Sequence, residues 1–199
     1  MNLRVSIFLA FVFTVGITGA ETETKDLGFE IFRDNCMACH LQTGMGIREM
    51  NAPSIAGLPR WYISDQLRKF RRDQRGFDED DLAGKLMKAN ASALDERSIA
   101  FVGRYIESLP VNPSRNTLNT PVSEEGIALY QQHCLSCHGE NLEGNRSERI
   151  PPLNRQPDWY LLRQMENFSS GKRVHFESDK LVLSESEIEK IVSWICERH

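Results

Sequence analysis

Two short segments of the chain carry the same arrangement of two thiols and one imidazole. The motif Cys-x-x-Cys-His occurs at Cys36, Cys39 and His40, and again at Cys134, Cys137 and His138. Two thiols one helical turn apart can each add to a vinyl group of haem, and the histidine that follows can then bind the iron. A redox-active cysteine pair would leave the two histidines unexplained, and a zinc knuckle is the remaining alternative. The spacing predicts two covalently bound haem c groups as cofactors.

The similarity between the two motifs extends into the surrounding sequence, which indicates an internal repeat. At an offset of 98 residues, glycine, proline, aromatic and polar positions of the first half return in the second. The pairs include Gly28 and Gly126, Phe32 and Tyr130, Pro53 and Pro151, Trp61 and Trp159, Tyr62 and Tyr160, Gln66 and Gln164, and Arg75 and Arg173. Further along, the offset falls to 89, so the second copy lacks nine residues between positions 174 and 183.

Each copy contains three segments with helical periodicity, and nothing in the chain has the pattern of a sheet. The predicted helices are residues 25–35 and 123–133 before the motifs, middle helices that begin near Trp61 and Trp159, and final helices at 94–108 and 184–197. We therefore predict an all-α fold. Its two domains are residues 21–110 and 122–199, joined by a linker at 111–121 that is rich in proline and asparagine.

Two such modules in tandem resemble the dihaem class I cytochromes c of the c4 type, over nearly all of residues 25–199. The resemblance implies that Gly28 and Gly126 allow the first and final helices of each module to cross closely, with aromatic residues filling the crossing. It also implies that the carbonyl group of Pro53 accepts a hydrogen bond from His40 and fixes its ring. The second module departs from this pattern, because Arg155 stands where the first has Gly57.

The resemblance also implies a sixth iron ligand for the first haem. Met87 lies seven residues before Leu94, at the position of the axial methionine of the family. Met45 and Met50 are alternatives in the loop after His40. A thioether favours ferrous iron, so His/Met ligation predicts the higher reduction potential for this haem.

The second module has no methionine at the corresponding position. Its only methionine, Met165, aligns with the apolar face of the middle helix and is expected in the core. The loop that remains, residues 171–180, offers His175, whose neutral imidazole is a good iron ligand. An open iron site, or ligation by Met165 or Lys180, are the alternatives.

The cofactors predict electron transfer between redox protein partners, from the second haem to the first, rather than catalysis. A membrane-associated oxidase or dehydrogenase is a possible partner. The alternative is gas-ligand sensing or small-molecule redox chemistry, such as a peroxidase-like activity, at an open second haem.

Residues 1–20 have the pattern of a secretory signal peptide, which predicts a periplasmic protein. Arg4 precedes an apolar run from Val5 to Ile17, and Thr18 to Ala20 are small residues suited to cleavage. An uncleaved membrane anchor is the alternative. The formal net charge of −4 argues against nucleic acid as a partner.

A cluster of basic residues around the middle helix of the first module could dock an acidic partner, or could be an ordinary solvated face. Its members are Arg60, Arg68, Lys69, Arg71, Arg72 and Arg75, and the acidic run 78–81 follows directly.

The leader raises the overall apolar content to 40%, and without it two small domains would have little core of their own. Two covalent haems would supply the missing apolar volume. Cys196 remains as a fifth cysteine, and the helical period places it on an outward face.

Overall fold

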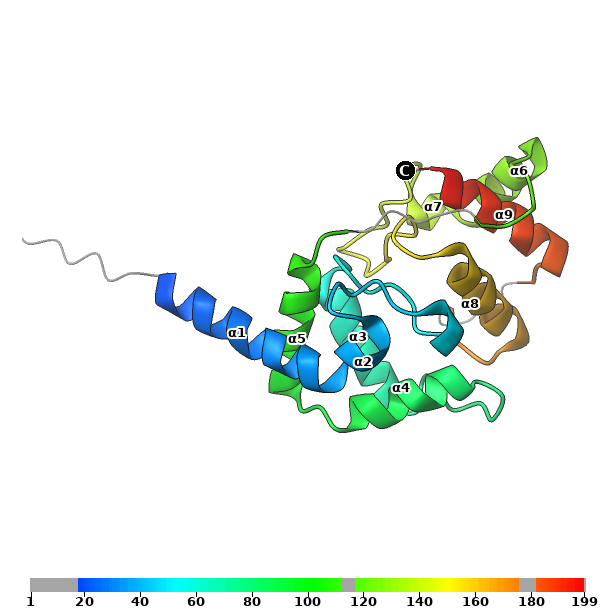
Figure 1. The fold of residues 1–199 in the computed structure, drawn as a ribbon. Coiled ribbons are helices and arrows are strands. Elements are labelled where there is room, and N and C mark those ends of the chain that lie inside the picture. The colour runs from blue at the N-terminus through cyan, green and yellow to red at the C-terminus, as the bar shows by residue number, and fades with distance from the viewer. Residues whose placement is uncertain (1–17, 112–116, 176–181, 199) are drawn as a thin grey trace, which may run out of the picture.

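The computed structural model describes residues 18–111, 117–175 and 182–198, and the part described is helical (Figure 1). The first module comprises α1 (Thr18–Asn35), α2 (Met37–His40), the 3-10 turn η1 (Arg48–Met50), α3 (Arg60–Arg71), α4 (Leu82–Ser92) and α5 (Glu96–Ser108). The second comprises α6 (Glu124–His133), α7 (Leu135–His138), α8 (Asp158–Ser170) and α9 (Glu185–Glu197). The predicted all-α fold is confirmed.

The first and last helices of each module cross closely, α1 on α5 and α6 on α9. A Cβ atom added at Gly28 would lie 2.7 Å from the carbonyl oxygen of Phe101, and one at Gly126 would lie 2.5 Å from that of Lys190. Both distances are shorter than a van der Waals contact. Glycine is therefore required at the two crossings because the backbones leave no room for a side chain.

Aromatic pairs fill these crossings, as expected. The rings of Phe32 and Tyr105 have centroids 5.2 Å apart, and those of Tyr130 and Trp194 are 4.3 Å apart. Phe32 and Tyr130 are fully buried. The repeat therefore preserves both the glycine and the aromatic ring that packs beside it.

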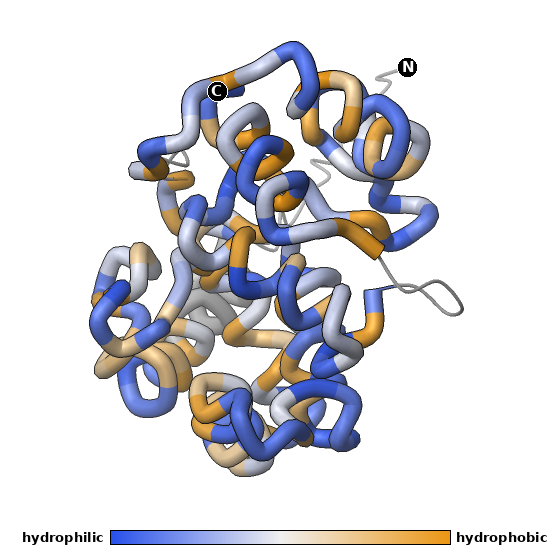
Figure 2. The backbone as a smooth tube through the Cα atoms, turned by 90° about the vertical axis from the view of Figure 1, so that its right-hand side faces the viewer, coloured by the Kyte–Doolittle hydropathy of each residue, from blue (hydrophilic) through white to orange (hydrophobic). Residues whose placement is uncertain are grey.

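Helices α6 and α9 of the second module begin at side-chain caps. The side chain of Ser123 accepts a hydrogen bond from the amide of Gly126 at the start of α6, and Ser184 forms a capping box with Glu187 at the start of α9. In Figure 2 polar and apolar residues alternate along the helical turns. The apolar faces that predicted the helices are thus the faces with which the helices pack.

Helix α4 is a helix that the sequence did not predict, since the three predicted helices of the first module leave residues 82–92 unassigned. Its apolar positions give little signal, since Leu82 and Leu86 are 70% and 64% exposed. The side chain of Asp81 caps it by accepting a hydrogen bond from the amide of Gly84. The helix packs against α3, so tertiary contact and a cap stabilise a segment with a weak pattern.

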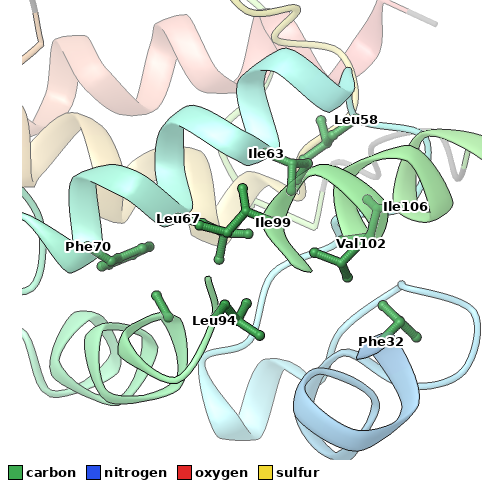
Figure 3. Packing of buried hydrophobic residues seen from close by; sticks show 10 residues of the cluster. Phe32, Leu58, Ile63, Leu67, Phe70, Leu94, Ile99, Val102 and Ile106 are labelled. Carbon is green, nitrogen blue, oxygen red and sulfur yellow. The ribbon is translucent and has the colours of Figure 1, made fainter. Parts of the chain in front are cut away.

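The core of the first module lies where α3 and α5 face each other (Figure 3). Side chains of Ile63 and Leu67 on α3 point toward Ile99 on α5, and Leu94 and Phe70 continue the cluster toward α4. The second module repeats this core between α6, α8 and α9, and Met165 belongs to it as predicted.

The outward position predicted for Cys196 is wrong, because this residue is 0% exposed. The residues that enter the second module cover α9: Ser193 donates a hydrogen bond of 2.6 Å to the carbonyl oxygen of Thr120. Helical periodicity gave the wrong face because this segment packs over it. Burial raises the pKa of the Cys196 thiol to about 12.

The predicted leader lies outside the described residues, except for Thr18 to Ala20, which form the start of α1. Helix α1 therefore begins earlier than the predicted residue 25. Among the residues that the structure describes, no helix is long and apolar enough to cross a membrane.

Replacing Gly126 with alanine should destabilise the second module by roughly 1–3 kcal/mol, because the new methyl group must push α6 away from α9. The thermal unfolding midpoint of the haem-loaded protein measures this effect. As a control, Ala128→Val on the exposed side of α6 should leave the midpoint nearly unchanged. Equal midpoints for the two variants would show that the crossing is not tight.

Candidate haem sites

Both motif histidines are buried and held by the same hydrogen bond. Nδ1 of His40 lies 2.9 Å from the carbonyl oxygen of Pro53, and Nδ1 of His138 lies 3.1 Å from that of Pro151. A ring nitrogen that donates to a carbonyl group leaves Nε2 as the free lone pair for a metal ion. The short helices α2 and α7 thus hold two imidazoles in the orientation that an axial ligand needs.

The loops that carry these prolines have the same path in both modules. An isolated bridge pairs Ile47 with Ala52 in the first module, and the equivalent bridge pairs Asn145 with Ile150 in the second. Arg155, the residue that departs from the pattern, donates a hydrogen bond to the carbonyl oxygen of Gly57. The substitution therefore leaves the loop intact and adds a contact between the two modules.

The chemistry of the motif side chains fits covalent haem. Nε2 of His40 is buried with no hydrogen-bond partner among the described residues, as expected for an atom that binds iron. Burial lowers the pKa of His40 and brings that of His138 to about 4, so both imidazoles are neutral at physiological pH. Burial also raises the pKa of Cys36 to about 12 and that of Cys134 to about 11.

A cavity in the first module extends from the motif to the module interface. It is lined at one end by Cys36, Cys39 and His40, and Met87 of α4 lines it as well. Met87 also packs against the core cluster of the module. The structure thus places the predicted pair His40 and Met87 around one cavity.

In the second module the structure brings His175 next to His138. Their ring centroids are 6.2 Å apart with planes inclined by 26°, and the ring of Phe168 lies 4.7 Å from that of His175. His175 is exposed, and partial desolvation together with the nearby charges of Arg173 and Lys69 lowers its pKa. A shortened loop therefore places a neutral imidazole near the proximal histidine.

The other candidate ligands lie in different surroundings. Met45 is 43% exposed and Met50 is 49% exposed, although Met50 also lines the cavity of the first module. Met165 is buried in the core of the second module. Lys180 lies outside the described residues.

A ring of hydrogen bonds joins the two modules, a role that the sequence analysis did not predict for any of its members. Arg75 donates to Gln66 at 2.7 Å and to Gln164 at 3.2 Å, while Arg173 donates to Gln164 at 2.6 Å and to Gln66 at 3.1 Å. Each arginine also reaches a tyrosine of the other module, Tyr160 or Tyr62. The signal was present in the sequence, because all six residues recur at the offset of 98.

This ring changes the interpretation of the basic cluster around α3. Arg75 is buried at the module interface and is no part of a surface patch. Arg68 and Arg71 both form ion pairs with Glu96, at 2.8 Å and 2.9 Å. The cluster is therefore partly neutralised within its own module, which favours the solvated face over the docking patch.

Comparisons with known proteins identify the family of both modules. A family model described as cytochrome c matches the chain twice, over residues 26–110 and 123–197. The chain is 23% identical to cytochrome c4 of Azotobacter vinelandii, over 94% of this chain and 96% of that protein. It is 29% identical to the thiosulfate dehydrogenase electron acceptor of Thiomonas intermedia, over 70% of this chain and 64% of that protein. The solved thiosulfate dehydrogenase TsdBA of Marichromatium purpuratum has a TM-score of 0.71 at 25% identity, over 88% of this chain and 40% of that one.

Replacing Cys36 and Cys39 together with alanine should leave one covalently bound haem per chain instead of two, because only the second motif can then form thioether bonds. The mass of the denatured protein and its haem absorbance measure the count. Cys196→Ala is the matched control and should retain both haems. Two haems in the double variant would contradict attachment at the first motif.

Proposed function

Because the chain belongs to the cytochrome c family and carries two haem c groups, we propose that it passes electrons from its second haem to its first. The modules correspond to residues 21–110 and 122–199. The observation that carries the proposal is the direct contact of two haem-binding modules, with a cavity of the first that is also lined by residues of the second. Haem iron supplies a one-electron couple, and the protein sets its potential through the axial ligands and surroundings.

For the first haem we propose His40 and Met87 as the axial ligands. Both residues line the same cavity, and the hydrogen bond to Pro53 orients the His40 ring. A thioether is a soft ligand that stabilises ferrous iron, which raises the reduction potential. This haem is accordingly the electron acceptor within the molecule.

For the second haem we propose His138 and His175. Metal–imidazole bonds are about 2 Å long, so two imidazoles that bind one metal ion from opposite sides have ring centres roughly 6 Å apart. The observed separation of 6.2 Å supports this arrangement. Without a thioether ligand, a haem held by His138 and His175 would have the lower potential and would serve as the donor of the pair.

The interface between the modules supports electron transfer because it holds the two haem-binding modules together. Gln66 and Gln164 each accept hydrogen bonds from both Arg75 and Arg173, and an ion pair joins Asp65 to Arg149 across the same interface. Contacts of this kind keep the two modules in one relative position. Electron exchange between two haems needs a short and constant separation, which such an interface provides.

The partners are redox proteins, and we propose that the chain acts as a carrier rather than as an enzyme. A relative is named as the electron acceptor of thiosulfate dehydrogenase, which supports a periplasmic dehydrogenase as the class of donor. The apolar leader at residues 1–20 supports export to the periplasm. The chain spans 64% of that relative, so the donor itself is part of the proposal.

Met87→Ala should lower the reduction potential of the first haem by on the order of 0.1 V, a fraction of the roughly 0.8 V that axial ligands span. A spectroscopic redox titration of the full protein measures both midpoints. Met45→Ala, which removes an exposed methionine from the same module, should shift neither. An unchanged midpoint in Met87→Ala would exclude this residue as the ligand.

His175→Ala should convert the second haem from a six-coordinate to a five-coordinate state that binds carbon monoxide when reduced, whereas the wild type should not bind it. His133→Ala is the control, because His133 is exposed on α6. Carbon monoxide binding by the wild type at one haem would favour the alternative of gas sensing or small-molecule chemistry at an open iron.

A further inference from the structure

The cavity that holds the first haem is not built by the first module alone. Four residues of the second module line it, from the start of α8 and the loop before it: Gln156, Tyr160, Arg163 and Gln164. Tyr160 and Gln164 are already engaged with Arg75. Gln156 and Arg163 are not part of that ring, and they present polar groups to the cavity of the other module.

Both residues have a buried polar atom without a partner. Nε of Arg163 and Oε1 of Gln156 are buried, and neither has a hydrogen-bond partner among the described residues. The rest of the Arg163 guanidinium group is fixed: Nη2 donates to the carbonyl oxygen of Asn51 at 3.1 Å, and the group lies 5.4 Å from the ring centre of Trp159. A buried donor held in place and left unpaired is costly unless a ligand satisfies it.

The charges that line this cavity call for an anion. Arg75 and Arg163 are its cations, and burial together with the nearby Arg173 lowers the pKa of Arg75. The one carboxylate in the lining is Asp81, which is engaged as the cap of α4. Arg75 is satisfied by neutral partners, but the buried Nε of Arg163 has none among the described residues, and a carboxylate is the acceptor that best suits a guanidinium donor.

We infer that Arg163 belongs to the binding site of the first haem and that its buried Nε donates to the propionate carboxylates from the neighbouring module. Haem carries its vinyl groups and its propionates on opposite edges. Thioether bonds at Cys36 and Cys39 therefore direct the propionates away from the motif. The inference depends on the bound haem, and it does not depend on the direction of electron flow proposed above.

This contribution goes one way across the interface. At the offset of 98, the counterparts of Arg163 and Gln156 in the first module are Asp65 and Leu58. Asp65 forms ion pairs with Arg68 and Arg149, and Leu58 is buried in the core of its own module. The first module therefore has an acidic residue, Asp65, at the position equivalent to Arg163.

A fixed cation beside the propionates has a definite electrostatic effect. Reduction makes the haem more negative by one charge, and a nearby positive charge in a region of low dielectric constant stabilises that form. Arg163 should therefore raise the potential of the first haem and leave that of the second almost unchanged. The proposed Met87 ligand and the Arg163 contact would both raise the reduction potential of the first haem. Both would therefore increase the difference in potential between the two haems.

The test compares reduction potentials of the haem-loaded full-length protein with different residues at position 163. Arg163→Gln should lower the midpoint of the first haem and not that of the second. The Cys134→Ala, Cys137→Ala variant, which keeps only the first haem, assigns the two midpoints. Arg163→Lys retains the charge but lacks the Nε donor, so the midpoint should fall by less.

Arg149→Gln is the matched control. Arg149 is also an arginine of the second module that contacts the first, but it is exposed and pairs with Asp65. Its loss should shift neither midpoint appreciably. Equal shifts of both haems in Arg163→Gln, or no shift in either variant at position 163, would overturn the inference. A failure of the Met87 and His175 tests would leave this comparison valid, because it needs only two bound haems.

Discussion

One hydrogen bond in each module, from a histidine ring to a proline carbonyl group, fixes the geometry on which the rest depends. His40 and Pro53, like His138 and Pro151, tie the one-turn motif helix to the loop that follows it. The bond holds the ring and selects which nitrogen remains free. The bridge within that loop and the crossing glycines then place the ring against the core. Each module is in this sense a scaffold for one oriented imidazole.

The two modules share this scaffold but differ in the residue proposed as the second iron ligand. The first presents Met87 from a helix of its own, while the second has lost nine residues and places His175 near His138. The interface between the modules is also partly symmetric and partly not. The ring of Arg75, Arg173 and their glutamines is nearly symmetric. Arg163 and Asp65, in contrast, occupy equivalent positions and have opposite charges. A repeated fold thus differs between its two copies through a few residues outside the shared positions.

The features of the fold and of the site that depend on residues close together in the sequence could be predicted. Ser123 was predicted to start a helix, and the structure shows it as the cap of α6. Helix α4 was missed because its leucines face solvent, so no amphipathic period marks it. The outward face of Cys196 was wrong because the chain entering the second module covers it, and helical periodicity does not show which segment packs over a helix.

The sequence by itself determined the two haem motifs, the repeat and the helical class, because covalent attachment needs fixed residue types at fixed spacing and a helix needs its period. The tertiary structure decided how the modules meet. Gln66, Arg75, Gln164 and Arg173 lie far apart along the chain and recur without any local motif, yet folding brings them into one ring. The repeat shows that both modules share these residues, but contacts between distant segments depend on packing, which the repeat does not show.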